Sequence, residues 1–114
     1  MDLRVSDMLE MQAALLEKNK DRWSPNEPAY GRDALLWMME EIGEICSIIK
    51  KRGERDIMED VDVRATFVEE LADVSMYFHD LMRCFRVTAE EFSEAYFDKH
   101  RKNMARDFER EHEM

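Results

Sequence analysis

Glycine and proline are scarce in this sequence, with three glycines and two prolines among 114 residues. Because these residue types are the usual interruptions of a helix, their scarcity predicts long helices. No apolar run approaches the roughly 20 residues that a membrane-spanning helix needs, so we expect no membrane partner. Cysteine is equally rare. Cys46 and Cys84 both fall in apolar helical segments, where we expect free, buried thiols of a reducing cytoplasm.

Positive charge is also in deficit. Lysine and arginine number 17 against 27 aspartates and glutamates, which leaves a formal net charge of −10. Such a chain repels a nucleic-acid polymer and an anionic membrane surface, so neither is an expected partner. The start of the chain, Met-Asp-Leu-Arg, has no secretory leader pattern, which favours a cytoplasmic location. A small phosphorylated ligand brought in by a metal ion stays compatible with this charge.

The length suits a single domain over residues 1–114, with a charged tail at about 107–114 that we expect to fray. Apolar residues recur at helical spacing in four segments, near 6–20, 33–52, 63–85 and from 89 onward. The only cluster of proline and glycine lies between the first two segments and predicts a long loop there.

Capping residues support this division. Asp33 and Asp62 are the expected caps of the second and third helices, and the second should end near Gly53. Thr88-Ala89-Glu90-Glu91 is a capping box that opens the fourth helix. No strand pattern is present. The sequence therefore predicts an all-α protein, an antiparallel four-helix bundle-like fold with an internal helix repeat.

The internal repeat is a seven-residue pattern in the second and third helices. Its two copies are Met39-Glu40-Glu41-Ile42-Gly43-Glu44-Ile45 and Val68-Glu69-Glu70-Leu71-Ala72-Asp73-Val74. Residues three apart share a helix face, so Glu41 pairs with Glu44, and Glu70 pairs with Asp73. If the two helices face each other through a local twofold axis, the four carboxylates meet.

These acids differ in their place on the helix. On a wheel of ~100° per residue, Glu41 and Glu70 fall at the margin of the apolar arc, whereas Glu40 and Glu69 point away from it. A carboxylate at the edge of a core carries a desolvation cost and needs a partner. A solvated face, a salt-bridge network and a metal site are the three interpretations, and the mirrored pairs favour the metal site.

An all-oxygen site with several carboxylates suits Mg²⁺, and Mn²⁺ is possible. The rival carboxylate bundle is the di-iron type, which needs two Glu-x-x-His pairs. Only Glu109 and His112 fit that spacing, and they lie in the tail. The di-iron interpretation therefore fails on ligand count.

The pattern Glu41-x-x-Glu44 followed by Glu70-x-x-Asp73 resembles the signature of the all-α nucleoside triphosphate pyrophosphohydrolases, the MazG-like superfamily. The likeness extends to segments 32–44 and 69–77, which look like those of dCTP pyrophosphatases and MazG-type enzymes. The resemblance implies hydrolysis of a nucleoside triphosphate to the monophosphate and pyrophosphate. It also implies that these four acids ligate Mg²⁺ and that Glu41 takes the proton of the attacking water.

A third motif, Lys99-x-x-x-Asn103-x-x-Arg106, looks like that of the dCTP-hydrolysing branch, and the likeness then covers roughly residues 20–106. By this resemblance Lys99 and Arg106, or Lys50 and Lys51, hold the outer phosphates.

The resemblance also suggests which side chains meet the sugar or the base. Asn103 and Tyr77, one turn beyond Asp73, are the candidates. Trp23 matches a tryptophan that approaches the base in the dCTP branch, but a loop tryptophan can equally cover the edge of the core. For Trp37, packing in the core or at an interface is the favoured interpretation. Relatives of this kind are dimers or tetramers, so a homodimer or homotetramer is expected.

Two other functions stay open on the same scaffold. One is a catalytically inactive helical module for binding or assembly. The other is a carboxylate metal-binding protein that binds ions without consuming nucleotide. An inactive module should tolerate Glu41→Gln or Asp73→Asn with little change in stability or ligand binding, whereas in an enzyme either change should abolish turnover.

Overall fold

A computed structural model of the protein describes residues 1–106, and these are all-helical with no strand. The elements are α1 (Val5–Lys18), a short 3₁₀ helix η1 (Pro28–Tyr30), α2 (Gly31–Glu59), α3 (Val61–Cys84) and α4 (Ala89–Ala105). The predicted all-α class is therefore confirmed. The expected fraying of the tail and the Glu109-x-x-His112 pair lie outside the described residues.

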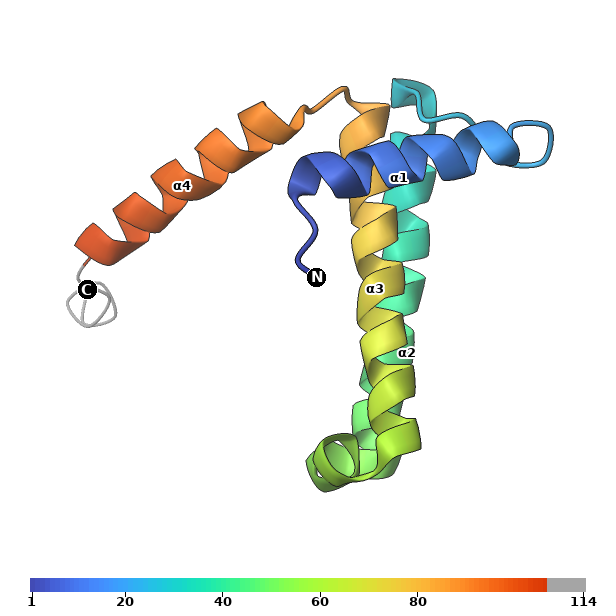
Figure 1. The fold of residues 1–114 in the computed structure, drawn as a ribbon, viewed down its shortest axis with the longest axis vertical. Coiled ribbons are helices and arrows are strands. Elements are labelled where there is room, and N and C mark those ends of the chain that lie inside the picture. The colour runs from blue at the N-terminus through green and yellow to red at the C-terminus, as the bar shows by residue number, and fades with distance from the viewer. Residues whose placement is uncertain (107–114) are drawn as a thin grey trace.

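The two longest helices, α2 and α3, form an antiparallel hairpin and run side by side (Figure 1). Asp60 is the turn between them, and its side chain accepts hydrogen bonds from the backbone N–H groups of Asp62 at 3.0 Å and Val63 at 3.2 Å. The prediction that Asp62 caps α3 was wrong by two residues. The extended backbone needed at a cap occurs at Asp60, so Asp62 already lies in the first helical turn.

The helix α2 changes direction at Gly53, which has φ 80° and ψ 168°. The second helix was expected to end near Gly53. The structure has a break in the regular helix at that residue, and the chain is then helical again to Glu59. This backbone conformation is essentially reserved for glycine. No heavy atom lies within 4 Å of a Cβ built there. Glycine is therefore required at this position by the backbone conformation and not by lack of space for a side chain.

A matched pair of alanine substitutions tests this account of α2. Gly53→Ala should lower the free energy of unfolding by about 1–3 kcal/mol, because alanine is strained at this φ and ψ. Gly43→Ala, in regular helix with open space around its Cβ, should raise it by about 0.5–1 kcal/mol. Urea unfolding of both variants measures the two values. Equal effects of the same sign would contradict the assignment.

Helix α1 crosses α3 near the open end of the hairpin, and α4 leaves that end and extends away from α2 and α3 (Figure 1). The predicted cap of α4 is confirmed, since Thr88 Oγ1 accepts from the Glu91 N–H at 3.1 Å. Beyond its packing on α1, α4 meets α3 where the ring of Phe92 lies 5.5 Å from that of Phe78. Within the described part of one chain, the four helices do not enclose a common bundle core.

The packing inside one chain leaves much apolar surface uncovered. Ile42, Ile49 and Leu71 belong to the apolar arcs of α2 and α3, yet each is at least 40% exposed. Both cysteines are free; Cys84 is buried as expected, but Cys46 is exposed, so its predicted burial was wrong. The hairpin covers one side of α2 and leaves Cys46 on another.

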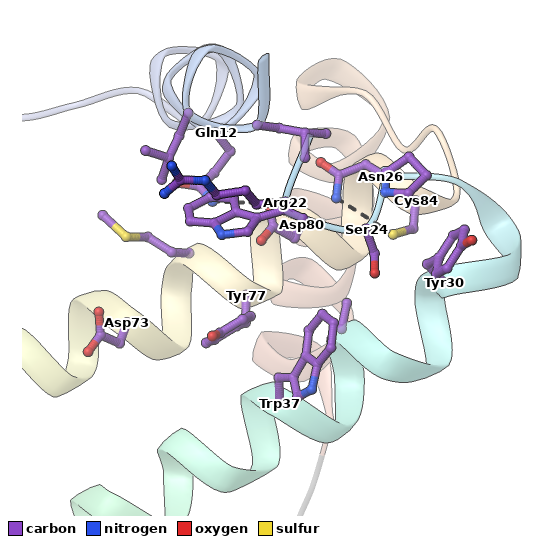
Figure 2. Close-up of a pocket in the computed structure, with 16 residues that line it drawn as sticks. Gln12, Arg22, Ser24, Asn26, Tyr30, Trp37, Asp73, Tyr77, Asp80 and Cys84 are labelled. Carbon is purple, nitrogen blue, oxygen red and sulfur yellow. Dashed lines mark hydrogen bonds between the residues drawn. The ribbon is translucent and has the colours of Figure 1, made fainter. Parts of the chain in front are cut away.

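A cavity of about 550 Å³ lies where α1, the loop after it, α2 and α3 meet (Figure 2). It lies beside the acid repeat, because Asp73 is one of its lining residues. None of the helices in residues 1–106 combines the length and apolar character needed to cross a bilayer.

Candidate functional site

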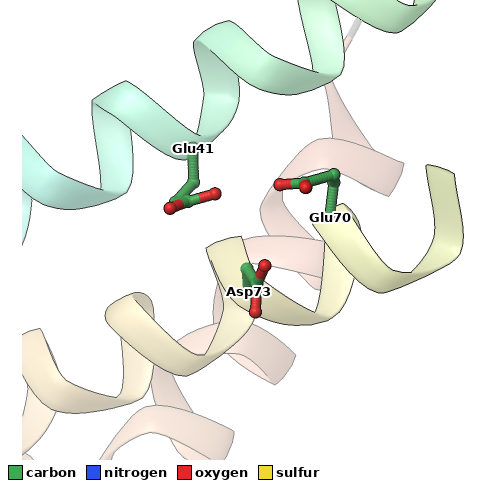
Figure 3. A group of neighbouring side chains, drawn as sticks. All are labelled: Glu41, Glu70 and Asp73. Atoms are coloured by element: carbon green, nitrogen blue, oxygen red, sulfur yellow. The ribbon is translucent and has the colours of Figure 1, made fainter. Parts of the chain in front are cut away.

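The antiparallel hairpin brings three of the four predicted metal ligands together. Glu41 comes from α2, and Glu70 and Asp73 come from successive turns of α3 (Figure 3). One carboxylate oxygen from each lies within 4.8 Å of the others, and all three residues are half-buried. We call Glu41, Glu70 and Asp73 the acid cluster. Their neighbours Glu40 and Glu69 are exposed, as the helical wheel predicted.

The acid cluster forms no ion pair with a basic side chain of residues 1–105. The ion pairs in this range join Lys20 to Glu17, Arg52 to Asp56 and Asp60, and Arg55 to Glu59, all elsewhere in the chain. The oxygen Oε2 of Glu70 is buried and accepts no hydrogen bond. A satisfied salt-bridge network, one interpretation of these acids, is therefore absent from this site.

The electrostatics of the cluster follow from this crowding. The pKa of Glu70 is raised, first because its protonated carboxyl can share a hydrogen bond with Glu41, and then because of burial. The negative charges of Glu41, Asp73 and Glu44 raise this pKa further. The cluster thus holds more negative charge than the surrounding protein compensates, and a cation there would relieve the repulsion.

Glu44, the fourth predicted ligand, is exposed and stands outside the group of three. It lies one turn along α2 from Glu41, near enough to raise the pKa of Glu70. Lys50 and Lys51 lie further along the same helix and are exposed. The structure therefore brings neither Glu44 nor these lysines into the acid cluster.

The donor set of the cluster fits Mg²⁺. An octahedral Mg²⁺ with bonds of about 2.1 Å holds its ligand oxygens no more than about 4.2 Å apart. The oxygens of Glu41, Glu70 and Asp73 already lie within 4.8 Å, so small side-chain rotations bring them into range. The Oε2 of Glu70 is buried and accepts no hydrogen bond, so it is available to coordinate a cation. Mn²⁺ accepts the same donors.

The cavity begins at the acid cluster, because Asp73 also lines it (Figure 2). Trp23, Trp37 and Tyr77 give it aromatic walls, and the rings of Trp37 and Tyr77 lie 6.2 Å apart at an angle of 53°. Burial, and after it the charges of Glu41 and Asp73, raise the pKa of the Tyr77 phenol, so the group stays neutral. The two tryptophans and Tyr77, singled out from sequence, thus share one cavity.

The polar lining of the cavity includes residues that the sequence had not suggested. Gln12, Asn26 and Asp80 line it; the Nε2 of Gln12 donates to Oδ1 of Asp80 at 3.0 Å, and Asn26 Oδ1 accepts at 2.6 Å from Nη1 of Arg83, which is not a lining residue. Asp80 and Gln12 had recognisable signals. Asp80 follows Asp73 at helical spacing on the same face of α3, and Gln12 is a polar residue within the apolar face of α1.

The third motif lies elsewhere in the single chain. Lys99 and Asn103 are exposed on α4, and Arg106 is exposed just after its end. Because α4 extends away from α2 and α3, these residues do not line the cavity (Figure 1). The structure thus brings together the metal-ligand and aromatic candidates and separates them from the predicted phosphate contacts.

Comparison with protein-family models finds no matching family, and comparisons with curated proteins and with solved structures find no significant match.

Proposed function

We propose that the protein is a Mg²⁺-dependent nucleoside triphosphate pyrophosphohydrolase that cleaves (deoxy)nucleoside triphosphates to monophosphate and pyrophosphate. In the cytoplasm such an activity removes unwanted nucleotides from the pool. One observation carries the proposal: Asp73 belongs both to the acid cluster and to the wall of an aromatic cavity. A cation-binding group therefore adjoins a space suited to a planar base, as a metal-dependent nucleotide hydrolase requires.

The reaction assigns roles to residues of this chain. Glu41, Glu70 and Asp73 would hold Mg²⁺, which would neutralise phosphate charge and make a nearby water more acidic. The water oxygen attacks the α-phosphorus, the bond from that phosphorus to the bridging oxygen breaks, and pyrophosphate leaves with the oxygen. Glu41 takes the proton of the water. Glu41 is the one carboxylate of the cluster on α2, whereas the other two lie on α3. Exposed Glu44 is available as a further ligand.

The outer phosphates need positive charge, and among residues 1–106 only Arg22 supplies it to the cavity lining. We therefore propose a homodimer or homotetramer in which α4 of a second copy brings Lys99, Asn103 and Arg106 to the site. The exposed apolar side chains of α2, α3 and α4 support this assembly, because a stable monomer rarely leaves so many uncovered. A four-helix bundle would then form between copies, and Lys51 offers a second phosphate contact.

Pyrophosphate release from a panel of canonical and modified nucleoside triphosphates, with and without Mg²⁺, tests the proposal. We expect metal-dependent release with an equal yield of monophosphate. Release of inorganic phosphate and a diphosphate would instead indicate cleavage at another bond. Folded protein that binds Mg²⁺ but releases nothing across the panel would favour a metal-binding protein or an inactive assembly module.

A further inference from the structure

Further along α3 from the acid cluster, the middle of the cavity contains a fixed carboxylate (Figure 2). Oδ1 of Asp80 accepts a hydrogen bond from Gln12, a residue only 6% exposed on α1. Among residues 1–105, no hydrogen bond is donated to the other oxygen, Oδ2, and no Lys, Arg or His forms an ion pair with it. Asp80 lines the cavity, so Oδ2 is an acceptor available to whatever fills that space (Figure 2).

The position of Asp80 suits the base of a bound nucleotide. Asp73, Tyr77 and Asp80 follow one face of α3, and seven residues of helix separate the two acids by about 10 Å along the axis. A nucleotide with its α-phosphate at Asp73 therefore extends its sugar and base past Tyr77 toward Asp80. The aromatic walls are suited to stacking against a base but do not distinguish one base from another.

We propose that Asp80, held in place by Gln12, selects nucleobases that carry an exocyclic amine over the same bases with a carbonyl oxygen in its place. The inference rests on the proposed function, which it deepens by naming the substrate class. An ionised carboxylate only accepts hydrogen bonds. The amine of cytosine or adenine donates one, whereas the corresponding oxygen of uracil or hypoxanthine is an acceptor and would face Oδ2 with lone pair against lone pair.

The neighbours of Asp80 act in opposite directions on its charge. Burial raises the pKa of its carboxyl above the ordinary value, and the hydrogen bond from Gln12 and the charges of Arg83 and His79 offset only part of that rise. Gln12 donates its N–H only to an acceptor, so the hydrogen bond itself favours the ionised form. Gln12 thus both positions the Asp80 carboxylate and favours its ionised form, which explains why this nearly buried amide lies in the apolar face of α1.

The test compares kcat/KM for two matched pairs, dCTP with dUTP and dATP with dITP, in which an oxygen replaces the amine and the adjacent ring nitrogen gains a hydrogen. The wild-type protein should prefer the amine-bearing member by on the order of tenfold or more. In Asp80→Asn the carbonyl can keep the hydrogen bond from Gln12 and the new amide N–H₂ faces the base. The preference should therefore fall and reverse toward dUTP and dITP. Gln12→Leu should reduce the preference without reversing it.

A control and a second readout separate this inference from the proposed function. Asp62→Asn makes the same chemical change at an exposed site on α3 and should leave the ratios unchanged. Binding of dCMP and dUMP, followed by the fluorescence of Trp23 and Trp37, gives the base preference without turnover. Turnover with ratios near one, or ratios that Asp80→Asn leaves unchanged, overturns the inference and leaves the proposed function standing. Absent turnover rejects the hydrolase, and tighter binding of dCMP than of dUMP that Asp80→Asn abolishes then still supports base selection by Asp80.

Discussion

Glu70→Gln should abolish Mg²⁺-dependent pyrophosphate release, with a loss on the order of 10²–10³-fold or more in kcat. Glutamine keeps the shape of the side chain but removes one charge and one ligand from the acid cluster. The buried Oε2 that accepts no hydrogen bond would become an uncharged amide atom, which is a poorer ligand for a hard cation. The measurement is pyrophosphate release at saturating Mg²⁺ for both proteins.

The same substitution should leave the metal-free fold as stable as the wild type, or more so. A hydrogen bond with Glu41, burial and then the charges of Glu41 and Asp73 raise the pKa of Glu70, so the ionised cluster is repulsive without a cation and the neutral amide removes part of this repulsion. Mg²⁺ should raise the melting temperature of the wild type and not that of Glu70→Gln, because the ion stabilises the folded state only where it binds.

Glu69→Gln is the matched control, since it removes the same charge from the adjacent, exposed position on α3. Its activity and its stabilisation by Mg²⁺ should equal those of the wild type. If Glu70→Gln keeps both properties, the acid cluster does not hold the catalytic metal. If it loses both together with its thermal stability, Glu70 is needed for folding, and the relief of repulsion inferred here is wrong.

Local periodicity was sufficient to predict the helices and the choice of acids. Glu41 and Glu70 were separated from Glu40 and Glu69 by their angle on the helix, which a helical wheel gives without knowledge of the fold. The wheel does not give the level at which two helices cross. Glu44 shares the face of Glu41, but the turn of α3 that approaches α2 lies opposite Glu41, so Glu44 stays exposed.

Features that depend on tertiary contacts were beyond the sequence. The hydrogen bond from Gln12 to Asp80 joins residues on α1 and α3, far apart in the chain, and no short-range pattern specifies such a pair. The direction of α4 could not be predicted from the sequence either. Thr88 fixes where α4 begins, whereas the turn before it, with Arg86 at φ 57°, decides where the helix points.

The direction of α4 leads to the second large effect, which is complementation between inactive variants. Asn103→Ala should strongly reduce activity if α4 of one copy completes the site of another, and Glu70→Gln should be inactive on its own. When equal amounts of the two are mixed as oligomers, about a quarter of the sites combine an intact acid cluster with an intact α4. Activity should therefore return from near zero to about a quarter of that of the wild type.

A mixture of Glu70→Gln and Asp73→Asn provides the control. Both changes fall in the acid cluster, whose three residues come from one chain, so no exchange of subunits rebuilds an intact cluster and the mixture should stay inactive. Size-exclusion chromatography with two different tags verifies that mixed oligomers form. Mixed oligomers of Glu70→Gln and Asn103→Ala without activity would mean that α4 does not act on the site of another copy. The phosphate contacts would then have to come from the same chain, with Arg22 in the cavity and Lys51 on α2 as the remaining candidates.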